Sequence, residues 1–295
     1  ASWSVTLAMG AALGGLVTAS FGRNTAFIID SSSFFISAAF ISTVRMRKRS
    51  RATGVDSRLK RASMYELLGL ADIVDGARYL KTNPQVAALL LVKSGWGLGG
   101  GVLLLLTVFG KQIFPIGNEG SASIGLLFAA RGVGALIGPI VASRIAAGSA
   151  SRMRRAIAVA FVVSCVFYLL FAQAPVFAVA LVCVVGAHSG GSIQWVYSTT
   201  LLQMSVEDKF LGRVFALDMA LVTLAMSVST YATGWGLDRG GLNPRTMATL
   251  LGFVFVVPAL AWFVIQRRLN AREACEKEPA PPASDPATEI SLPPA

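Results

Sequence analysis

Charged side chains are scarce in this chain of 295 residues: they make up 14% of it, whereas about 25% is usual in a soluble domain. The charges present are mostly basic, with 26 Lys and Arg against 15 Asp and Glu, and the mean hydropathy is +0.64. A soluble nucleic-acid-binding protein with a pI of 10.1 would need more charge to cover its surface, so that class is excluded. A disordered chain is excluded too, because 54% of the residues are hydrophobic. The composition predicts an integral membrane protein.

Cysteine and histidine are also rare. The three cysteines show no CxxC or CxxH spacing, which excludes a disulfide framework or a zinc site built on such motifs. The single histidine, His188, lies in an apolar run without a nucleophile-elbow motif, and the chain has no GxxxxGK[ST] sequence. We therefore expect no enzyme activity, no metal or other cofactor, and no nucleic-acid partner.

Long apolar runs are abundant. A helix needs about 20 apolar residues to cross the hydrocarbon core, and it satisfies the backbone hydrogen bonds that lipid cannot. The sequence predicts an all-α integral membrane bundle with eight transmembrane helices. The eight runs are Trp3–Ser20, Asn24–Val44, Gln85–Gly110, Ser121–Ser143, Ala156–Ala174, Pro175–Val206, Val214–Leu237 and Thr246–Gln266.

Lys and Arg are unevenly distributed between the two sides of the predicted bundle. The connections 45–81, 144–155 and 209–213, together with the tail after Gln266, hold twenty of them, and the opposite side holds four. By the positive-inside rule the twenty-charge side is cytoplasmic. This predicts a multi-pass protein of the inner (plasma) membrane with a cytoplasmic C-terminus and with lipid contacts. Because Ala1 leads directly into an apolar run, we expect earlier helices to be missing from this chain.

The longest connection follows the second run. Ser63 and Glu66 form a capping box, and the apolar residues that follow recur at helical spacing. This predicts an amphipathic helix on the membrane surface, ending at Pro84. Pro, Ala, Ser and acidic residues dominate the C-terminal end, which predicts a disordered cytoplasmic tail. We expect two helices in 1–44, a linker in 45–84, a six-helix bundle in 85–268 and the tail in 269–295.

Glycine-rich motifs are spread along the chain. They include Gly10–Gly15 (GAALGG), Gly132–Pro139 (GVGALIGP) and Asp208–Leu217 (DKFLGRVFAL). In this order, with two helices, a basic linker and six helices, they resemble the last eight helices of a major facilitator superfamily transporter. The resemblance is to the exporter-like branch, which includes enterobactin and macrolide exporters, and it covers residues 1 to about 268. It implies a twelve-helix fold, of which the N-terminal four helices are missing here.

Two pairs of glycines in these motifs are spaced four residues apart. They are Gly10 with Gly14 and Gly134 with Gly138, and Pro139 follows the second pair. Such spacing lets two helices approach closely and slide. We expect these residues to serve packing or gating.

Five ionisable residues lie inside the predicted spans, where they are costly and usually face a cavity or a partner. From the helical rise, Lys93 and Arg131 lie within about 6 Å of each other in height near the midplane, and Asp218 and His188 share a similar height. The family resemblance implies that the helices carrying these four residues line a central cavity. The fifth, Asp30, does not fit this pattern, and we expect it to pair with the arginine before its run.

The candidate roles follow from charge. We predict that Asp218 and His188 carry protons, and that Lys93, Arg131 and Gln194 bind the substrate. Because we expect no acid beside Lys93 and Arg131 in this half of the molecule, an anionic small molecule would balance their charge. An acid in the missing helices, or static pairs that pin helices together, would explain the same residues.

The expected function is export of a small molecule by alternating access, driven by proton entry because no nucleotide-binding motif is present. An importer of the same fold is one alternative. A flux assay in vesicles with a defined proton gradient would distinguish import from export. A non-transporting membrane scaffold or receptor is another. Its activity would survive neutralisation of Asp218.

Overall fold

The computed structural model describes residues 9–10, 13–14, 17–18, 20–43, 70–146 and 148–277, with only the backbone at 70–73 and 272–277. Every secondary-structure element in these residues is helical, which confirms the predicted all-α class. In chain order the elements are α2 (Arg23–Thr43), α5 (Leu70–Thr82), α6 (Pro84–Gly97), α7 (Val102–Val108), the π-helical turn η1 (Phe109–Ile113), the 3₁₀ turn η2 (Asn118–Gly120), α8 (Ser121–Ala146), α9 (Ala150–Ala172), α10 (Phe177–Ser205), α11 (Asp208–Asp238), α12 (Pro244–Val254) and α13 (Val256–Lys277).

Seven helical segments of the described residues are long and apolar enough to cross a membrane. One is α2. The other six lie between Pro84 and Ala271 and match the six predicted runs from Gln85 onward. Of the run predicted first, Trp3–Ser20, the structure describes only residues 9–10, 13–14, 17–18 and 20. The long run Pro175–Val206 forms a single helix, α10, of 29 residues.

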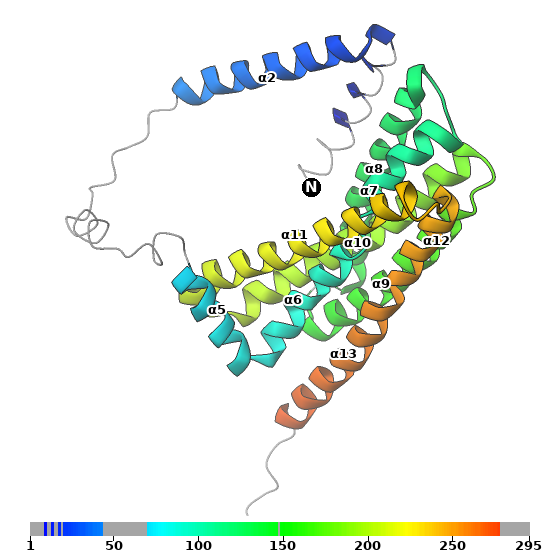
Figure 1. The fold of residues 1–295 in the computed structure, drawn as a ribbon. Coiled ribbons are helices and arrows are strands. Elements are labelled where there is room, and N and C mark those ends of the chain that lie inside the picture. The colour runs from blue at the N-terminus through cyan, green and yellow to red at the C-terminus, as the bar shows by residue number, and fades with distance from the viewer. Residues whose placement is uncertain are drawn as a thin grey trace, which may run out of the picture.

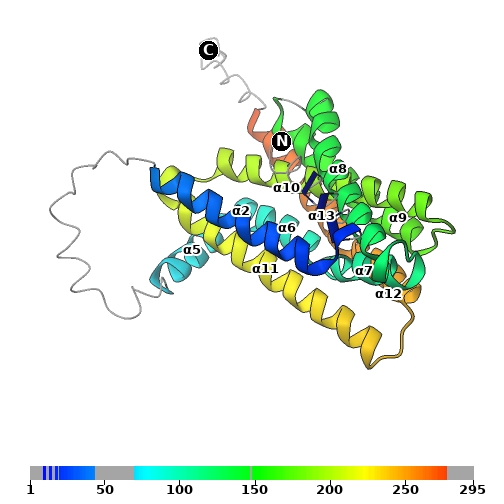
Figure 2. The same ribbon diagram turned by 90° about the horizontal axis from the view of Figure 1, so that it is seen from above.

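The helices α6 to α13 form one bundle, in which α10 packs against α6, α8 and α9 (Figures 1 and 2). On either side of this centre, α11 packs along α6, and α12 and α13 pack along α9. Figure 1 shows α2 apart from the bundle, and none of its residues is buried. The bundle is therefore where buried polar side chains meet.

The expected pair between Arg23 and Asp30 is wrong. Arg23 instead lies 3.7 Å from the carboxylate of Glu119, across the gap between α2 and the start of α8. The physical reason is distance along the helix, because seven residues place Asp30 about 10 Å further along α2.

Local sequence explains where several helices begin. Ser149 accepts a hydrogen bond from the amide of Arg152 at the start of α9, and Asn243 accepts one from the amide of Thr246 at the start of α12. In the first turn of α8, the hydroxyl of Ser123 donates to the carbonyl of Gly110 at 3.0 Å and so ties this helix to the start of η1. These contacts satisfy backbone groups that a helix end leaves free.

The helix that begins at Pro84 is interrupted between α6 and α7. The backbone there tightens into bonds between residues three apart, such as Gly100 N to Gly97 O at 2.8 Å. The hydroxyl of Ser229 on α11 donates to the carbonyl of Leu98 at 2.6 Å and accepts from the amide of Gly101 at 3.0 Å. Because lipid offers no hydrogen bonds, this one side chain satisfies two backbone groups that the interruption frees.

The predicted linker and tail are described only in part. The capping box at 63–66 lies outside the described residues. The linker helix α5 ends at Thr82, and only Asn83 separates it from Pro84, where the sequence predicts its end. At the other end α13 continues to Lys277, beyond the expected bundle end at 268. A contact near this end holds it to the bundle, because Asn270 accepts a 2.9 Å hydrogen bond from Nε of Arg154.

Candidate functional site

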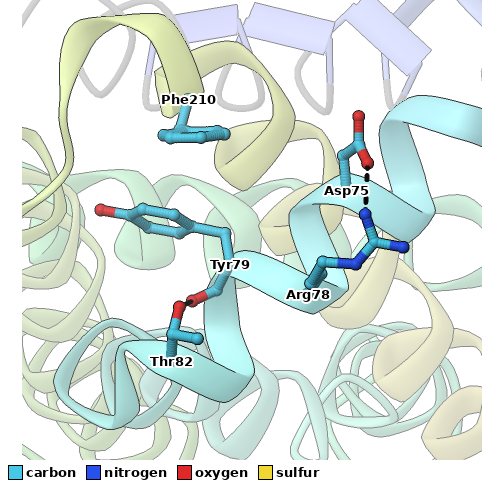
Figure 3. A pocket seen from close by; sticks show the side chains of 5 residues that line it. All are labelled: Asp75, Arg78, Tyr79, Thr82 and Phe210. Carbon is cyan, nitrogen blue, oxygen red and sulfur yellow. Dashed lines mark hydrogen bonds and ion pairs between the residues drawn. The ribbon is translucent and has the colours of Figure 1, made fainter.

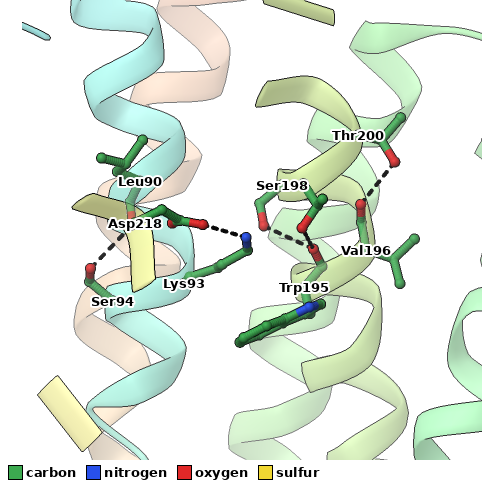
Figure 4. Close-up of polar contacts among 9 residues, drawn as sticks. Leu90, Lys93, Ser94, Trp195, Val196, Ser198, Thr200 and Asp218 are labelled. Atoms are coloured by element: carbon green, nitrogen blue, oxygen red, sulfur yellow. Dashed lines mark hydrogen bonds and ion pairs between the residues drawn. The ribbon is translucent and has the colours of Figure 1, made fainter. Parts of the chain in front are cut away.

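Lys93 and Asp218 form an ion pair inside the bundle. Lys93 extends from α6 toward α11, where its Nζ donates to Oδ2 of Asp218 (Figure 4). The side chains are 1% and 0% exposed, so neither charge reaches solvent. Oδ1 of the same carboxylate has no hydrogen-bond partner among the described residues. The pair thus links α6 and α11 through Oδ2 and leaves Oδ1 buried without a hydrogen-bond partner among the described residues.

Aromatic rings from two helices surround the ammonium of Lys93. Its Nζ lies 4.9 Å from the ring centroid of Trp195 on α10 and 5.5 Å from that of Phe215 on α11. Trp195 in turn meets Trp96 edge-on, with centroids 5.8 Å apart. Desolvated cation–π contacts of this kind stabilise an ammonium by about 2 kcal/mol. The rings therefore support the charge of Lys93 independently of Asp218.

A second polar cluster joins α8, α9 and α10. Nε of Arg131 on α8 donates to Nε2 of His188 on α10 at 3.0 Å. Tyr168 on α9 also contacts the imidazole, with its hydroxyl 3.2 Å from Nδ1 and 3.5 Å from Nε2. An Nε2 that accepts a hydrogen bond belongs to a neutral ring with its proton on Nδ1, so this ring carries no charge.

Gln194 is buried between α10 and α9. Its Nε2 donates to the hydroxyl of Ser164 at 3.3 Å, and that hydroxyl donates to the carbonyl of Ala187. Its Oε1 has no partner among the described residues. The predicted role of Gln194 in binding substrate stays a prediction, and its observed contacts belong to the α9–α10 interface.

Glycines of α8 lie where this helix contacts α10. A Cβ atom at Gly134 would lie 3.1 Å from Cβ of His188, and one at Gly138 would meet the backbone of Ser189. Pro139 lies next to them inside α8. Only a hydrogen fits at Gly134 and Gly138, and whether the two glycines and Pro139 serve packing or gating stays a prediction. Gly10 and Gly14 meet no described neighbour within 4 Å, so their role stays a prediction.

The linker helix α5 contacts the start of α11. Figure 3 shows the ring of Tyr79 facing that of Phe210, with centroids 4.5 Å apart, and the guanidinium of Arg78 beside Asp75. Together with Thr82 these residues line an open cavity of about 400 Å³. The cavity contains none of the predicted site residues, which lie further along the bundle.

One prediction about the charges is wrong. We expected no acid beside Lys93 and Arg131, yet Asp218 pairs with Lys93. Depth arithmetic places Asp218 level with His188 rather than with Lys93, and it does not give the direction of Asp218 around the α11 axis. His188, expected to relay protons to Asp218, instead contacts Arg131 and Tyr168, and no described contact joins it to Asp218.

Two further polar residues escaped the sequence analysis. The hydroxyl of Tyr168 contacts the imidazole of His188, and the hydroxyl of Ser229 bridges the interruption between α6 and α7. A signal existed for both, because a hydroxyl inside an apolar run must find a partner. That signal does not say which partner, since each contact joins two different helices.

Metal-ligating residues are dispersed in the part of the chain that the structure describes. No three His, Cys, Asp or Glu side chains gather there into a group able to hold a metal ion. Cys165 and Cys183 are free thiols buried in α9 and α10. The chemistry available in the bundle is that of charge pairing and hydrogen bonding.

Comparison with known proteins identifies the family. A family model described as Major Facilitator Superfamily matches residues 1–230, more than half of the chain. The matched region contains both polar clusters of the bundle. No curated protein and no solved structure gives a significant match. The chain therefore belongs to the Major Facilitator Superfamily, a family of multi-pass membrane transporters.

Proposed function

We propose that this protein exports a small molecule across the inner (plasma) membrane by proton-coupled alternating access, with the ion pair between Lys93 and Asp218 as the proton-sensitive contact. One observation carries the proposal: a fully buried pair of opposite charges joins α6 to α11 within membrane-spanning helices. Ionisable residues at such depth are expensive, and they commonly mark ion or substrate pathways.

The proton would act on the free oxygen of the carboxylate. Oδ2 of Asp218 is held by Lys93, while Oδ1 has no partner among the described residues and is open to a proton. Protonation there neutralises Asp218 and removes its Coulomb attraction for the ammonium. Lys93 keeps the face of Trp195 on α10 as a partner, so it can remain charged while α6 and α11 separate. Loss of the proton on the other side of the membrane restores the pair.

Two further features support this direction and placement. The similarity of the N-terminal motifs to the exporter-like branch favours export over import. The Lys and Arg distribution favours a cytoplasmic C-terminus. His188 stays a proposed proton carrier, with Arg131 and Tyr168 as the partners that its protonation would affect.

Proteoliposomes containing the complete protein test the proposal. Three labelled probes share a phenyl ring and differ in charge: benzenesulfonate, phenyl phosphate and benzyltrimethylammonium. An acidic lumen should drive accumulation of at least one probe in exchange for protons. Asp218→Asn should abolish that accumulation and still exchange labelled for unlabelled probe. Asp238→Asn, which removes an exposed acid from the same helix, should behave as the wild type.

The outcomes separate the alternatives. Accumulation driven only by an acidic exterior would show an importer of the same fold. Accumulation in Asp218→Asn equal to that of the wild type would remove this carboxylate from proton coupling. Absence of flux for all three probes, with or without a gradient, would favour the scaffold or receptor alternative.

A further inference from the structure

The charges inside the bundle do not balance. Lys93 and Asp218 cancel each other, and the hydrogen-bonding pattern makes His188 neutral. This leaves the guanidinium of Arg131 as a positive charge with no carboxylate within ion-pair distance among the described residues. An uncompensated charge at this depth is costly, so a negative partner would gain a large interaction energy there.

The contacts of Arg131 show which of its atoms are available. Nε donates to His188, which fixes one edge of the guanidinium plane, and the two terminal Nη groups make no hydrogen bond or ion pair among the described residues. These two groups form the planar fork that binds carboxylate, sulfonate or phosphate oxygens in a bidentate manner. Lysine could supply the charge at this position but not both contacts at once, because it is a point charge without a fork.

The surroundings hold this fork in one place. Tyr168 is buried, its hydroxyl contacts the imidazole of His188, and its ring stacks on Phe255 with centroids 5.2 Å apart. Gly134 lies one turn along α8 from Arg131. Because it has no side chain, α8 approaches α10 so closely that a Cβ atom at this position would lie 3.1 Å from Cβ of His188. The hydrogen bond to neutral His188 already orders the guanidinium, so binding an anion costs less side-chain entropy.

We infer that Arg131 is the binding site for an anionic group of the transported molecule, a carboxylate, sulfonate or phosphate, and that His188 and Tyr168 position it. This rests on the proposed transport function and revises the sequence-based prediction, in which Lys93 and Arg131 shared the anion. Lys93 already has a counter-charge, so Arg131 binds the anion alone while the Lys93–Asp218 pair is closed.

Ligand-dependent stability tests the site without requiring flux. The complete protein is placed in phosphatidylcholine nanodiscs, which contain no anionic lipid, and its unfolding midpoint is measured against increasing benzenesulfonate, phenyl phosphate or benzyltrimethylammonium. A ligand that binds the folded state raises the midpoint in a saturable way. We expect this for one or both anions and not for the cation.

Variants assign the effect to Arg131. Arg131→Gln, which still offers an amide donor to His188, should weaken anion affinity at least tenfold, and Arg131→Lys, which keeps the charge, should weaken it by a similar factor. If the Gln variant does not fold, the Lys variant carries the test. Arg239→Gln removes an exposed arginine and should bind as the wild type does.

Opposite results would overturn the inference. Equal stabilisation by the cation, or full anion affinity in Arg131→Lys, would show that no anion uses the fork. No stabilisation of the wild type by either anion would mean that Arg131 is occupied by an acid of the complete protein. Failure of the proposed function looks different: anions would still bind at Arg131, but no proton gradient would drive their flux.

Discussion

The hydroxyl of Ser229 donates to the carbonyl of Leu98 at 2.6 Å, across the interface between α11 and the interruption that separates α6 from α7. The same oxygen accepts from the amide of Gly101 at 3.0 Å. Backbone groups at membrane depth need a partner inside the protein, and here a side chain on a neighbouring helix provides it. Its contact with α11 therefore stabilises the interruption.

Ser229→Ala should destabilise the bundle by about 1–3 kcal/mol, because two backbone groups lose their partner in a buried position. The unfolding midpoint of the purified protein in mixed detergent measures the change. Ser227→Ala removes an exposed hydroxyl two residues earlier on α11 and serves as the control. Equal midpoints for the two variants would mean that water or a backbone shift replaces Ser229.

Neutralising one member of the buried pair should destabilise the protein by about 3–5 kcal/mol, because the other charge is left unpaired. We expect this for Lys93→Met and, to a smaller degree, for Asp218→Asn, because the aromatic rings still support Lys93. The double variant Lys93→Met/Asp218→Leu should recover most of the lost stability but not proton-driven flux. Recovery of both would assign the pair a purely structural role.

Gly134→Ala should separate α8 from α10 and destabilise the bundle by about 1–3 kcal/mol, the usual cost of overpacking. The added methyl group would press against the backbone of Val185 and against His188, so anion affinity at Arg131 should fall as well. Gly212→Ala is the matched control, because a Cβ there meets nothing within 4 Å. A stable Gly134→Ala protein with normal affinity would contradict the tight α8–α10 contact.

Reporter fusions to the complete protein test the predicted orientation. Fusions after Arg51, Ser149 and Arg272 should report the cytoplasm, and those near Asn118 and Asn243 the opposite side, since the basic connections stay inside. Reversed signals at both sets of positions would overturn the orientation and, with it, the proposed direction of proton entry.

The sequence alone was sufficient for the class and for the order of the helices. Runs of about 20 apolar residues are local features, and the energy of placing each run in lipid depends little on its neighbours. The limits of the described spans therefore follow the predicted runs from Gln85 onward, and the end of the linker helix before Pro84 follows from the proline itself.

The interruption after Gly97 was not predicted, although the glycines that form it are visible in the sequence. Glycine makes a helix easy to interrupt, but whether it breaks depends on what takes over the freed hydrogen bonds. Ser229 does so from a position more than a hundred residues away. Such a contact appears only when the two helices have been placed side by side.

The candidate site shows the same division. The sequence placed Lys93, Arg131, His188 and Asp218 within the apolar spans, because position along a helix sets the expected depth. Only the tertiary structure decided that Lys93 pairs with Asp218, and that His188 lies between Arg131 and Tyr168. Depth is a property of one helix, whereas a contact also depends on how each helix is rotated and which neighbours it packs against. That rotation is set by the packing of the whole bundle, including the glycines that bring α8 onto α10.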